Sequence, residues 1–196
     1  EMNSSIYSMR IIGGKWRGRK ISFAPHDEIR PTPSRIRETL FNWLQGYIHG
    51  ANCLELYAGS GVLSFESLSR GASSVTLVEH SSLVHSHLVN ELKHITDASD
   101  AFQCYNTSAA AWVQQPHNSP FQIIYLDPPF AGGELSKILP LIVDQGLLSA
   151  DGLIYVESPT MIIPAALPAS LEIFKQKKAG KVHYCLCRFS HQPNIQ

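Results

Sequence analysis

From residue 53 onward, apolar segments alternate with helical ones, and this alternation constrains the fold more than any other feature of the chain. Near-continuous apolar runs occur at CLEL, SVTLVE, AFQCYN, FQIIYL and LIYVES. Strands that are apolar along their whole length are typically buried on both faces in a parallel sheet covered by helices. The segment LEIFKQKKAGKVHYCLCRF predicts an antiparallel hairpin turning at Ala179 and Gly180. We therefore expect an α/β domain with a mostly parallel sheet, and a helix near residues 135–146 interrupted or kinked at Pro140.

A smaller unit is expected ahead of this domain. Residues 9–23 read as two short strands around a basic turn that contains glycine. A helix with one apolar face follows, with Thr32 as its N-cap and Pro33 as its first residue. We place the boundary so that residues 1–50 form a basic hairpin-and-helix extension and residues 51–196 form the main domain.

The formal net charge of zero hides an uneven distribution. Residues 1–50 carry eight Lys/Arg against four Asp/Glu, residues 51–172 carry three against twelve, and residues 173–196 carry five against none. An acidic body between two basic ends suits a catalytic domain that binds a polyanion, although solvated charged faces would give the same counts.

Several classes of protein are disfavoured. No apolar run approaches the roughly 18 residues of a membrane span, and the first ten residues lack the pattern of a secretion signal, so we expect a soluble, cytoplasmic protein. The four cysteines form no C-x-x-C pair and the histidines match no metal spacing, so we expect buried free thiols and no metal site.

The segment Glu55-Leu56-Tyr57-Ala58-Gly59-Ser60-Gly61 ends a predicted strand and leads into a helix. Glycines let the backbone approach a ligand, and the helix N-terminus offers free N–H groups. Glu79 ends the next predicted strand, where a carboxylate can bind both ribose hydroxyls of a nucleoside. The pattern also fits a dinucleotide site, but Ser64 replaces the third glycine of G-x-G-x-x-G. It therefore favours a nucleoside-containing cofactor over a purely structural turn.

A second motif, Asp127-Pro128-Pro129-Phe130, closes the fourth predicted strand. Two prolines remove two N–H donors, so this turn presents hydrogen-bond acceptors. The Asp127 carboxylate and the Pro128 carbonyl can accept both hydrogens of a nucleobase amine and stabilise the positive charge that develops during methyl transfer. Phe130 can stack on the base. At this place in the sheet, the motif favours an amino-methyltransferase over an ordinary strand-ending turn.

Taken together, four segments resemble the bacterial 16S ribosomal RNA guanine-N2 methyltransferase family: R-I-I-G-G-K-W-R-G-R-K, R-P-T-P-S-R-I-R-E-T-L-F-N, E-L-Y-A-G-S-G and D-P-P-F. The resemblance runs from about Met9 to Phe189. It implies a Rossmann-like class I methyltransferase fold with a seven-stranded sheet, S-adenosylmethionine as donor, and S-adenosylhomocysteine as product. It implies guanine N2 of 16S RNA as acceptor, usually guanine 966, within a wholly or partly assembled small subunit.

The resemblance also assigns roles to residues. Glu55 and Gly59 to Gly61 would hold the methionine part of the cofactor, Glu79 the ribose, and Asp127 to Phe130 the target guanine. Relatives usually place Asp or Asn where Ser108 stands, so Ser108 would contact the adenine amine from a shorter side chain. The cofactor-binding residues expected are Glu55, Tyr57, Ala58, Gly59, Ser60, Gly61, Glu79, Ser108 and Asp127, and the catalytic ones are Asp127, Pro128, Pro129 and Phe130.

The basic extension is expected to contact RNA, because Arg and Lys bind phosphates and aromatic planes stack on unpaired bases. Some of these cations could instead pair with the acidic body, and Trp16 could pack beneath the hairpin. The candidates are Arg10, Lys15, Trp16, Arg17, Arg19, Lys20, Arg30, Arg35 and Arg37.

The expected reaction is a direct in-line transfer by a monomer, without metal or covalent intermediate. An adenine-N6 methyltransferase on DNA or RNA would use the same acceptor turn, so the motifs leave the target base open. A nucleotide-dependent oxidoreductase would have no use for D-P-P-F. A non-catalytic RNA-binding module is disfavoured by two intact motifs.

Overall fold

A computed structural model describes residues 7–26, 29–96, 99–129 and 133–191. The strands are β1 (Ser8–Arg10), β2 (Lys20–Ser22), β3 (Asn52–Leu56), β4 (Ser74–Glu79), β5 (Phe102–Asn106), β6 (Phe121–Leu126), β7 (Leu148–Ser158), β8 (Leu171–Ala179) and β9 (Val182–Phe189). The helices are α1 (Ser34–Trp43), α2 (Val62–Ser69), α3 (Ser82–Ile95), α4 (Ala109–Val113) and α5 (Glu134–Asp144), with short 3-10 turns at Ser99–Ala101 and Pro164–Ala166.

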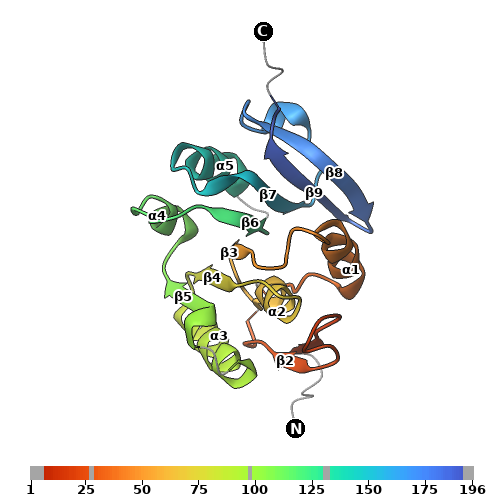
Figure 1. The fold of residues 1–196 in the computed structure, drawn as a ribbon, viewed down its shortest axis with the longest axis vertical. Coiled ribbons are helices and arrows are strands. Elements are labelled where there is room, and N and C mark those ends of the chain that lie inside the picture. Colours follow the sequence, from red (N-terminus) through yellow and green to blue (C-terminus); the bar gives the residue numbers. More distant parts are fainter. Residues whose placement is uncertain (1–6, 27–28, 97–98, 130–132, 192–196) are drawn as a thin grey trace.

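The main sheet has seven strands in the order β5-β4-β3-β6-β7-β9-β8 (Figure 1). The first five run parallel, whereas β9 is antiparallel to both β7 and β8. The β1–β2 hairpin forms a separate small antiparallel sheet. This confirms the predicted Rossmann-like methyltransferase architecture, including the C-terminal hairpin.

Helices cover both faces of the sheet, as the fully apolar strands require. The core on one face includes side chains of α1, α2, α3 and the β1–β2 hairpin, and the core on the other includes side chains of α4 and α5. The first core is continuous across residue 50, since Ile36 and Leu40 belong to the same cluster as Phe65 and Leu77. The boundary at residue 50 therefore does not separate two hydrophobic cores, and a division into two domains stays a prediction.

The predicted start of α1 is wrong, and the prediction at Pro140 is tested only in part. Pro33 is the residue before α1 and not its first residue, because its ψ of 150° is extended, and no side chain caps the helix. The Thr32 carbonyl instead accepts a hydrogen bond from Arg37 Nε at 3.0 Å. Pro140 lies within α5, so the helix is not interrupted there, and the alternative of a kink at Pro140 stays a prediction. No helix in the described part of the chain is long and apolar enough to cross a membrane.

Candidate active site

The glycine loop connects the carboxyl end of β3 to the first turn of α2. Gly59 and Gly61 have φ values of 54° and 69°, and Tyr57 also has a positive φ of 57°. Such a conformation costs free energy in a residue with a side chain and is found mainly at functional sites. A Cβ on Gly61 would lie 2.6 Å from Leu88 Cδ2, so α3, which carries Leu88, can pack this closely against the loop only because residue 61 is glycine. Glycine at position 61 is thus required by core packing, whereas a Cβ on Gly59 would meet only the Tyr57 carbonyl oxygen at 3.9 Å, so the space beside Gly59 is open.

Glu55 lies buried beneath this loop, on β3. Its Oε2 accepts hydrogen bonds from the backbone N–H of Ser64 at 2.9 Å and from the Ser64 hydroxyl. Burial raises the pKa of Glu55 to about 7, although the Ser64 hydrogen bonds favour the ionised form. Ser64, which in the sequence only weakened the dinucleotide pattern, therefore holds Glu55 in place.

Glu79 joins the glycine loop to the end of β4. Its Oε2 accepts a hydrogen bond from Gly59 N at 2.9 Å, and its Oε1 accepts one from Ser81 N at 3.0 Å. The carboxylate is buried, and it lines the same cleft as the glycine loop. The predicted ribose-binding residue is thus next to the predicted methionine-binding loop, as a nucleoside ligand requires.

Asp127 follows β6 directly and faces this cleft, with Pro128 and Pro129 beside it. Burial, then the neighbouring Glu157 carboxylate, then Glu55, raise the pKa of Asp127 to about 9. Glu157 lies on the adjacent strand, since Leu126 pairs with Val156. Two carboxyl groups this close hold one proton between them more readily than two charges. Phe130 lies outside the described residues.

The cleft has a volume of about 350 Å³ and lies at the carboxyl edge of the parallel strands. It brings together the glycine loop, Glu55, Glu79 and the Asp127 turn. The segment after β2 also lines the cleft, through His26, Ile29, Arg30, Pro31 and Thr32.

Ser108 lies in an adjoining hollow of about 260 Å³ that shares Tyr57, His80 and Pro129 with the main cleft. Ser108 is the N-cap of α4, and its Oγ accepts a hydrogen bond from Ala111 N at 3.2 Å. The Tyr57 hydroxyl lies 3.4 Å from Glu134 Oε2 at the same hollow. A flat ring bound here would adjoin a ribose held by Glu79.

Known proteins resemble this chain over most of its length. The family described as "Conserved hypothetical protein 95" matches residues 9–188. The chain belongs to this family. Two curated relatives are named "Ribosomal RNA small subunit methyltransferase D". The one from Haemophilus influenzae is 39% identical over 179 residues, covering 91% of this chain and 92% of its own. The one from Escherichia coli K12 is 41% identical over 184 residues, covering 94% and 91%.

A solved structure from Escherichia coli agrees with this membership of the Conserved hypothetical protein 95 family. It is described as a candidate methyltransferase, superimposes with a TM-score of 0.82 at 40% identity, and is covered over 99% of its length by 94% of this chain. A similar structure from Haemophilus influenzae, described as a candidate methylase, has a TM-score of 0.79 at 37% identity, with 98% of it and 93% of this chain covered.

The nine candidate RNA-binding residues do not form one surface. Arg30 lines the cleft, and Arg35 is exposed on the first turn of α1. Arg37 is fully buried, and its Nη1 lies 2.9 Å from Glu66 Oε1. Trp16 is 8% exposed and packs in the core. Arg37 and Trp16 are therefore corrections to the RNA-binding set, because neither buried side chain can reach a phosphate or stack on a base.

The remaining candidates, Arg10, Lys15, Arg17, Arg19 and Lys20, are exposed on or beside the β1–β2 turn. This turn lies at the end of the molecule opposite the cleft. Lys15 N donates to the carbonyl of Ser69, the last residue of α2, whereas the cofactor loop precedes the first residue of α2. Arg19 likewise reaches the carbonyl of Ile95, the last residue of α3, at 3.4 Å.

Sequence reasoning missed Glu157 and Tyr155. The Tyr155 hydroxyl donates to Glu157 Oε1 at 2.6 Å, and both side chains are buried. An acidic residue at the end of the apolar run LIYVES resembles Glu79 at the end of SVTLVE, and this likeness could have identified Glu157.

The cysteines and histidines suggest no further site. Cys53, Cys185 and Cys187 are buried free thiols, and Cys104 is half-buried. In the described ranges, no three His, Cys, Asp or Glu side chains are grouped so that they could hold a metal ion.

The raised pKa of Asp127 predicts how stability depends on pH. An unfolded aspartate loses its proton near pH 4, whereas folded Asp127 keeps its proton to about pH 9. Between these values the native state binds more protons, so the free energy of unfolding falls as pH rises. Asp127→Asn should flatten this fall by at least about 1 kcal/mol between about pH 5 and about pH 8, measured by urea unfolding. Exposed Asp144→Asn is the control, and parallel curves for Asp127→Asn and wild type would contradict the assignment.

Proposed function

We propose that this protein transfers a methyl group from S-adenosylmethionine to the exocyclic N2 amine of a guanine in 16S ribosomal RNA. The observation that carries the proposal is the acceptor-only turn at Asp127 and Pro128, which shares one cleft with the glycine loop and Glu79. The curated relatives' names support a small-subunit ribosomal RNA substrate. The choice of guanine N2, and of guanine 966, rests on the sequence resemblance.

The residues of the cleft fit S-adenosylmethionine. Three carboxylates, Glu55, Glu79 and Asp127, line the cleft. Among the described residues that line it, Arg30 alone is a lysine or arginine. Burial, with the neighbouring carboxyl groups, raises the pKa values of Glu55 and Asp127, so their ionised forms are disfavoured when no cation lies in the cleft. A ligand that carries a sulfonium and an ammonium group would lower these pKa values and favour the ionised carboxylates. Glu55 and the loop from Tyr57 to Gly61 would hold the methionine part, Glu79 the ribose and Ser108 the adenine.

The reaction follows from the groups at the Asp127 turn. When bound, S-adenosylmethionine supplies an electrophilic methyl group on sulfur. Asp127 and the Pro128 carbonyl would accept the two amine hydrogens, orient the nitrogen lone pair toward that methyl and stabilise the developing positive charge. As the N–C bond forms and the S–C bond breaks, the amine gains a formal positive charge and loses one proton. With a cationic ligand beside it, the Asp127 carboxyl group would be ionised, and it is then placed to accept that proton, with Glu157 behind it.

The proposed substrate also indicates where in the cell the protein acts and how the target base must reach the cleft. Ribosomal RNA and assembling subunits are cytoplasmic in bacteria, so we place the protein there as a monomer acting on a small subunit. The target amine takes part in base pairing and stacking, so the guanine must leave its stack to reach Asp127.

The test is methyl transfer from radiolabelled S-adenosylmethionine to unmodified small subunits, naked 16S RNA and duplex DNA, followed by digestion to nucleosides. We expect label in N2-methylguanosine from small subunits or their RNA, and none from DNA. Label in N6-methyladenine would show that the target base is adenine and not guanine, with the same methyl-transfer chemistry. No transfer to any acceptor, with no cofactor binding by calorimetry, would leave a non-catalytic RNA-binding module.

A further inference from the structure

The C-terminal hairpin carries a group of lysines without acidic partners. Lys175, Lys177 and Lys178 are exposed on β8, and Lys181 is exposed in the turn to β9. The hairpin's one carboxylate, Glu172, is held by Arg188 at 2.8 Å. Among the salt bridges of the described residues, none involves these four lysines. Their charge is therefore available to an external anion.

The strand register places Lys177 in the same row across the sheet as Asp127. Lys177 pairs with Tyr184, and Tyr184 pairs with Glu157, the neighbour of Asp127. Paired residues on adjacent strands point to the same face of a sheet. Tyr184 contacts Trp43 of α1, with ring centroids 5.4 Å apart, so this is the face covered by α1. Lys177 thus shares a row and a face with Asp127, three strand spacings or about 14 Å away.

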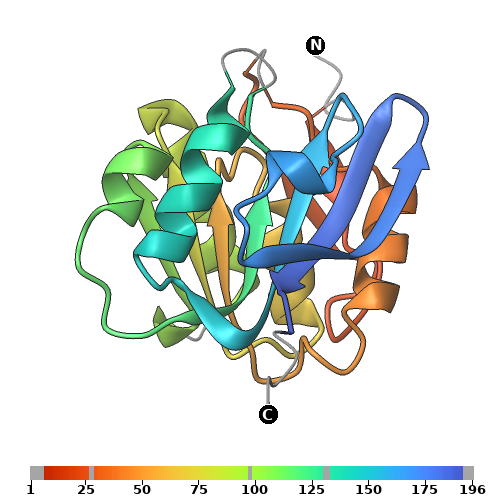
Figure 2. The same ribbon diagram turned by 90° about the horizontal axis from the view of Figure 1, so that it is seen from above.

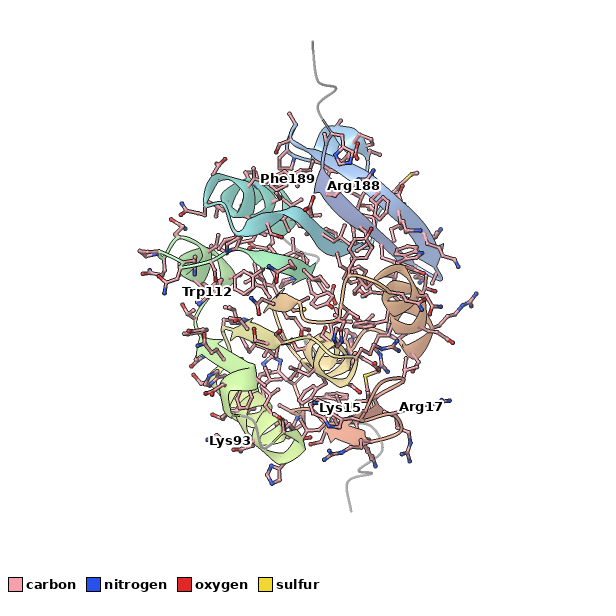
Figure 3. All side chains as sticks on the ribbon, viewed as in Figure 1. Lys15, Arg17, Lys93, Trp112, Arg188 and Phe189 are labelled. Carbon is pink, nitrogen blue, oxygen red and sulfur yellow. The ribbon has the colours of Figure 1, made fainter. Side chains whose placement is uncertain are left out.

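The tip of the hairpin extends this row toward the mouth of the cleft. Figure 2 shows the turn between β8 and β9 at the same edge of the sheet as the arrowheads of β3 and β6. Figure 3 shows Lys15 and Arg17 near the β1–β2 hairpin, at the other end of the molecule from Arg188 on β9. Lys177, Lys178 and Lys181 flank the turn that Figure 2 shows at the carboxyl edge of the sheet, whereas Lys15 N bonds to the carbonyl of Ser69 at the opposite end of α2 from the glycine loop.

We propose that Lys177, Lys178 and Lys181, the lysine tip, bind the phosphate backbone of the RNA strand that delivers the target base to Asp127. This inference rests on the proposed RNA substrate. About 14 Å corresponds to about four stacked nucleotides of one strand, so the lysine tip would hold phosphates a few residues from the flipped base. Arg30 and Arg35 would lie along the same strand, while the cations of the N-terminal turn would contribute little.

Edge strands also use lysines to prevent pairing with other chains. That role would make the lysine tip important for solubility and irrelevant to RNA. The two roles differ in what charge removal does to RNA binding, so the experiment compares two triple variants of equal charge change. One is Lys177→Gln, Lys178→Gln, Lys181→Gln; the other is Arg17→Gln, Arg19→Gln, Lys20→Gln in the N-terminal turn.

Binding is measured by fluorescence anisotropy with a labelled, unmethylated fragment of 16S RNA containing the target guanine, across a series of salt concentrations. The lysine-tip variant should bind at least about tenfold more weakly, and the slope of log affinity against log salt should decrease by about 2, because three phosphate contacts are lost. Its KM for RNA should rise while kcat and the affinity for S-adenosylmethionine stay within about twofold. The N-terminal variant should bind RNA within about threefold of wild type.

The outcomes separate this inference from the proposed function. If wild type forms N2-methylguanosine and the lysine-tip variant binds RNA as wild type does, the lysine tip is not the RNA surface and the function stands. If removal of the lysine tip weakens RNA binding but wild type methylates no guanine, the surface stands and the function fails. Equal losses in both variants would overturn the inference, as would aggregation of the lysine-tip variant on size exclusion with unchanged RNA affinity of its monomer.

Discussion

Asp127→Ala is expected to lower the rate of methyl transfer about 10²- to 10³-fold, the usual effect of removing one preorganised group that stabilises transition-state charge. The carboxylate would accept an amine hydrogen and then the proton released on transfer, and alanine can do neither. The substitution also removes one of two adjacent buried carboxyl groups, so it should not destabilise the fold. The measurement is kcat with saturating RNA and cofactor, alongside the urea midpoint of each variant.

Two further variants make this result specific. Asp127→Asn retains one acceptor oxygen but cannot take a proton, so its rate should lie between those of wild type and Asp127→Ala. Asp144→Ala removes an exposed carboxylate at the end of α5, outside the cleft, and should leave kcat unchanged. A rate for Asp127→Ala within about tenfold of wild type, with the same nucleoside product, would contradict the proposed role of Asp127.

The sequence predicts the sheet well because its central parallel strands are buried on both faces, unlike the edge strand β5, most of whose residues are exposed. Strands such as β4 and β6 must then be apolar along their length, and such runs are visible without any tertiary information. The start of α1 is less predictable, because proline has the right φ for a first helical residue but its ψ is set by tertiary contacts. Here the Thr32 carbonyl is held by Arg37, and Pro33 stays extended.

The candidate site is predictable where one short segment carries its chemistry, as at Glu55 to Gly61 and Asp127 to Pro129. It is less predictable where two distant segments must meet. Glu157 matters because β7 lies beside β6, a neighbour relation fixed by the sheet and not by either segment. The local sequence predicts an exposed arginine at position 37, but in the fold α2 places the Glu66 carboxylate against the Arg37 guanidinium. The local sequence therefore does not distinguish a buried, paired arginine such as Arg37 from an exposed one such as Arg35.

The pair of Arg37 and Glu66 shows how the N-terminal segment is attached. Arg37 Nη1 also donates to the carbonyl of Arg10 at 3.0 Å, and Glu66 accepts from the backbone N–H of Ile12 and from Arg70 Nε. Burial lowers the pKa of the Arg37 guanidinium, and the Glu66 carboxylate opposes that shift. One buried ion pair therefore joins β1, α1 and α2 across the predicted domain boundary.

Arg37→Met should consequently lower the free energy of unfolding by about 3–5 kcal/mol, because it leaves the buried Glu66 carboxylate with one fewer positive partner. The control is Arg35→Met, which removes an exposed arginine two residues earlier on α1 and should change stability by no more than about 0.5 kcal/mol.

Urea unfolding is followed by the fluorescence of Trp43 in the N-terminal segment and, in separate single-tryptophan variants, of Trp112 in the main domain. Coincident transitions are expected for wild type and Arg37→Met, since one core spans residue 50. A loss below about 1 kcal/mol would show that the pair contributes little. An earlier transition at Trp43 than at Trp112 would show that residues 1–50 unfold as a separate unit.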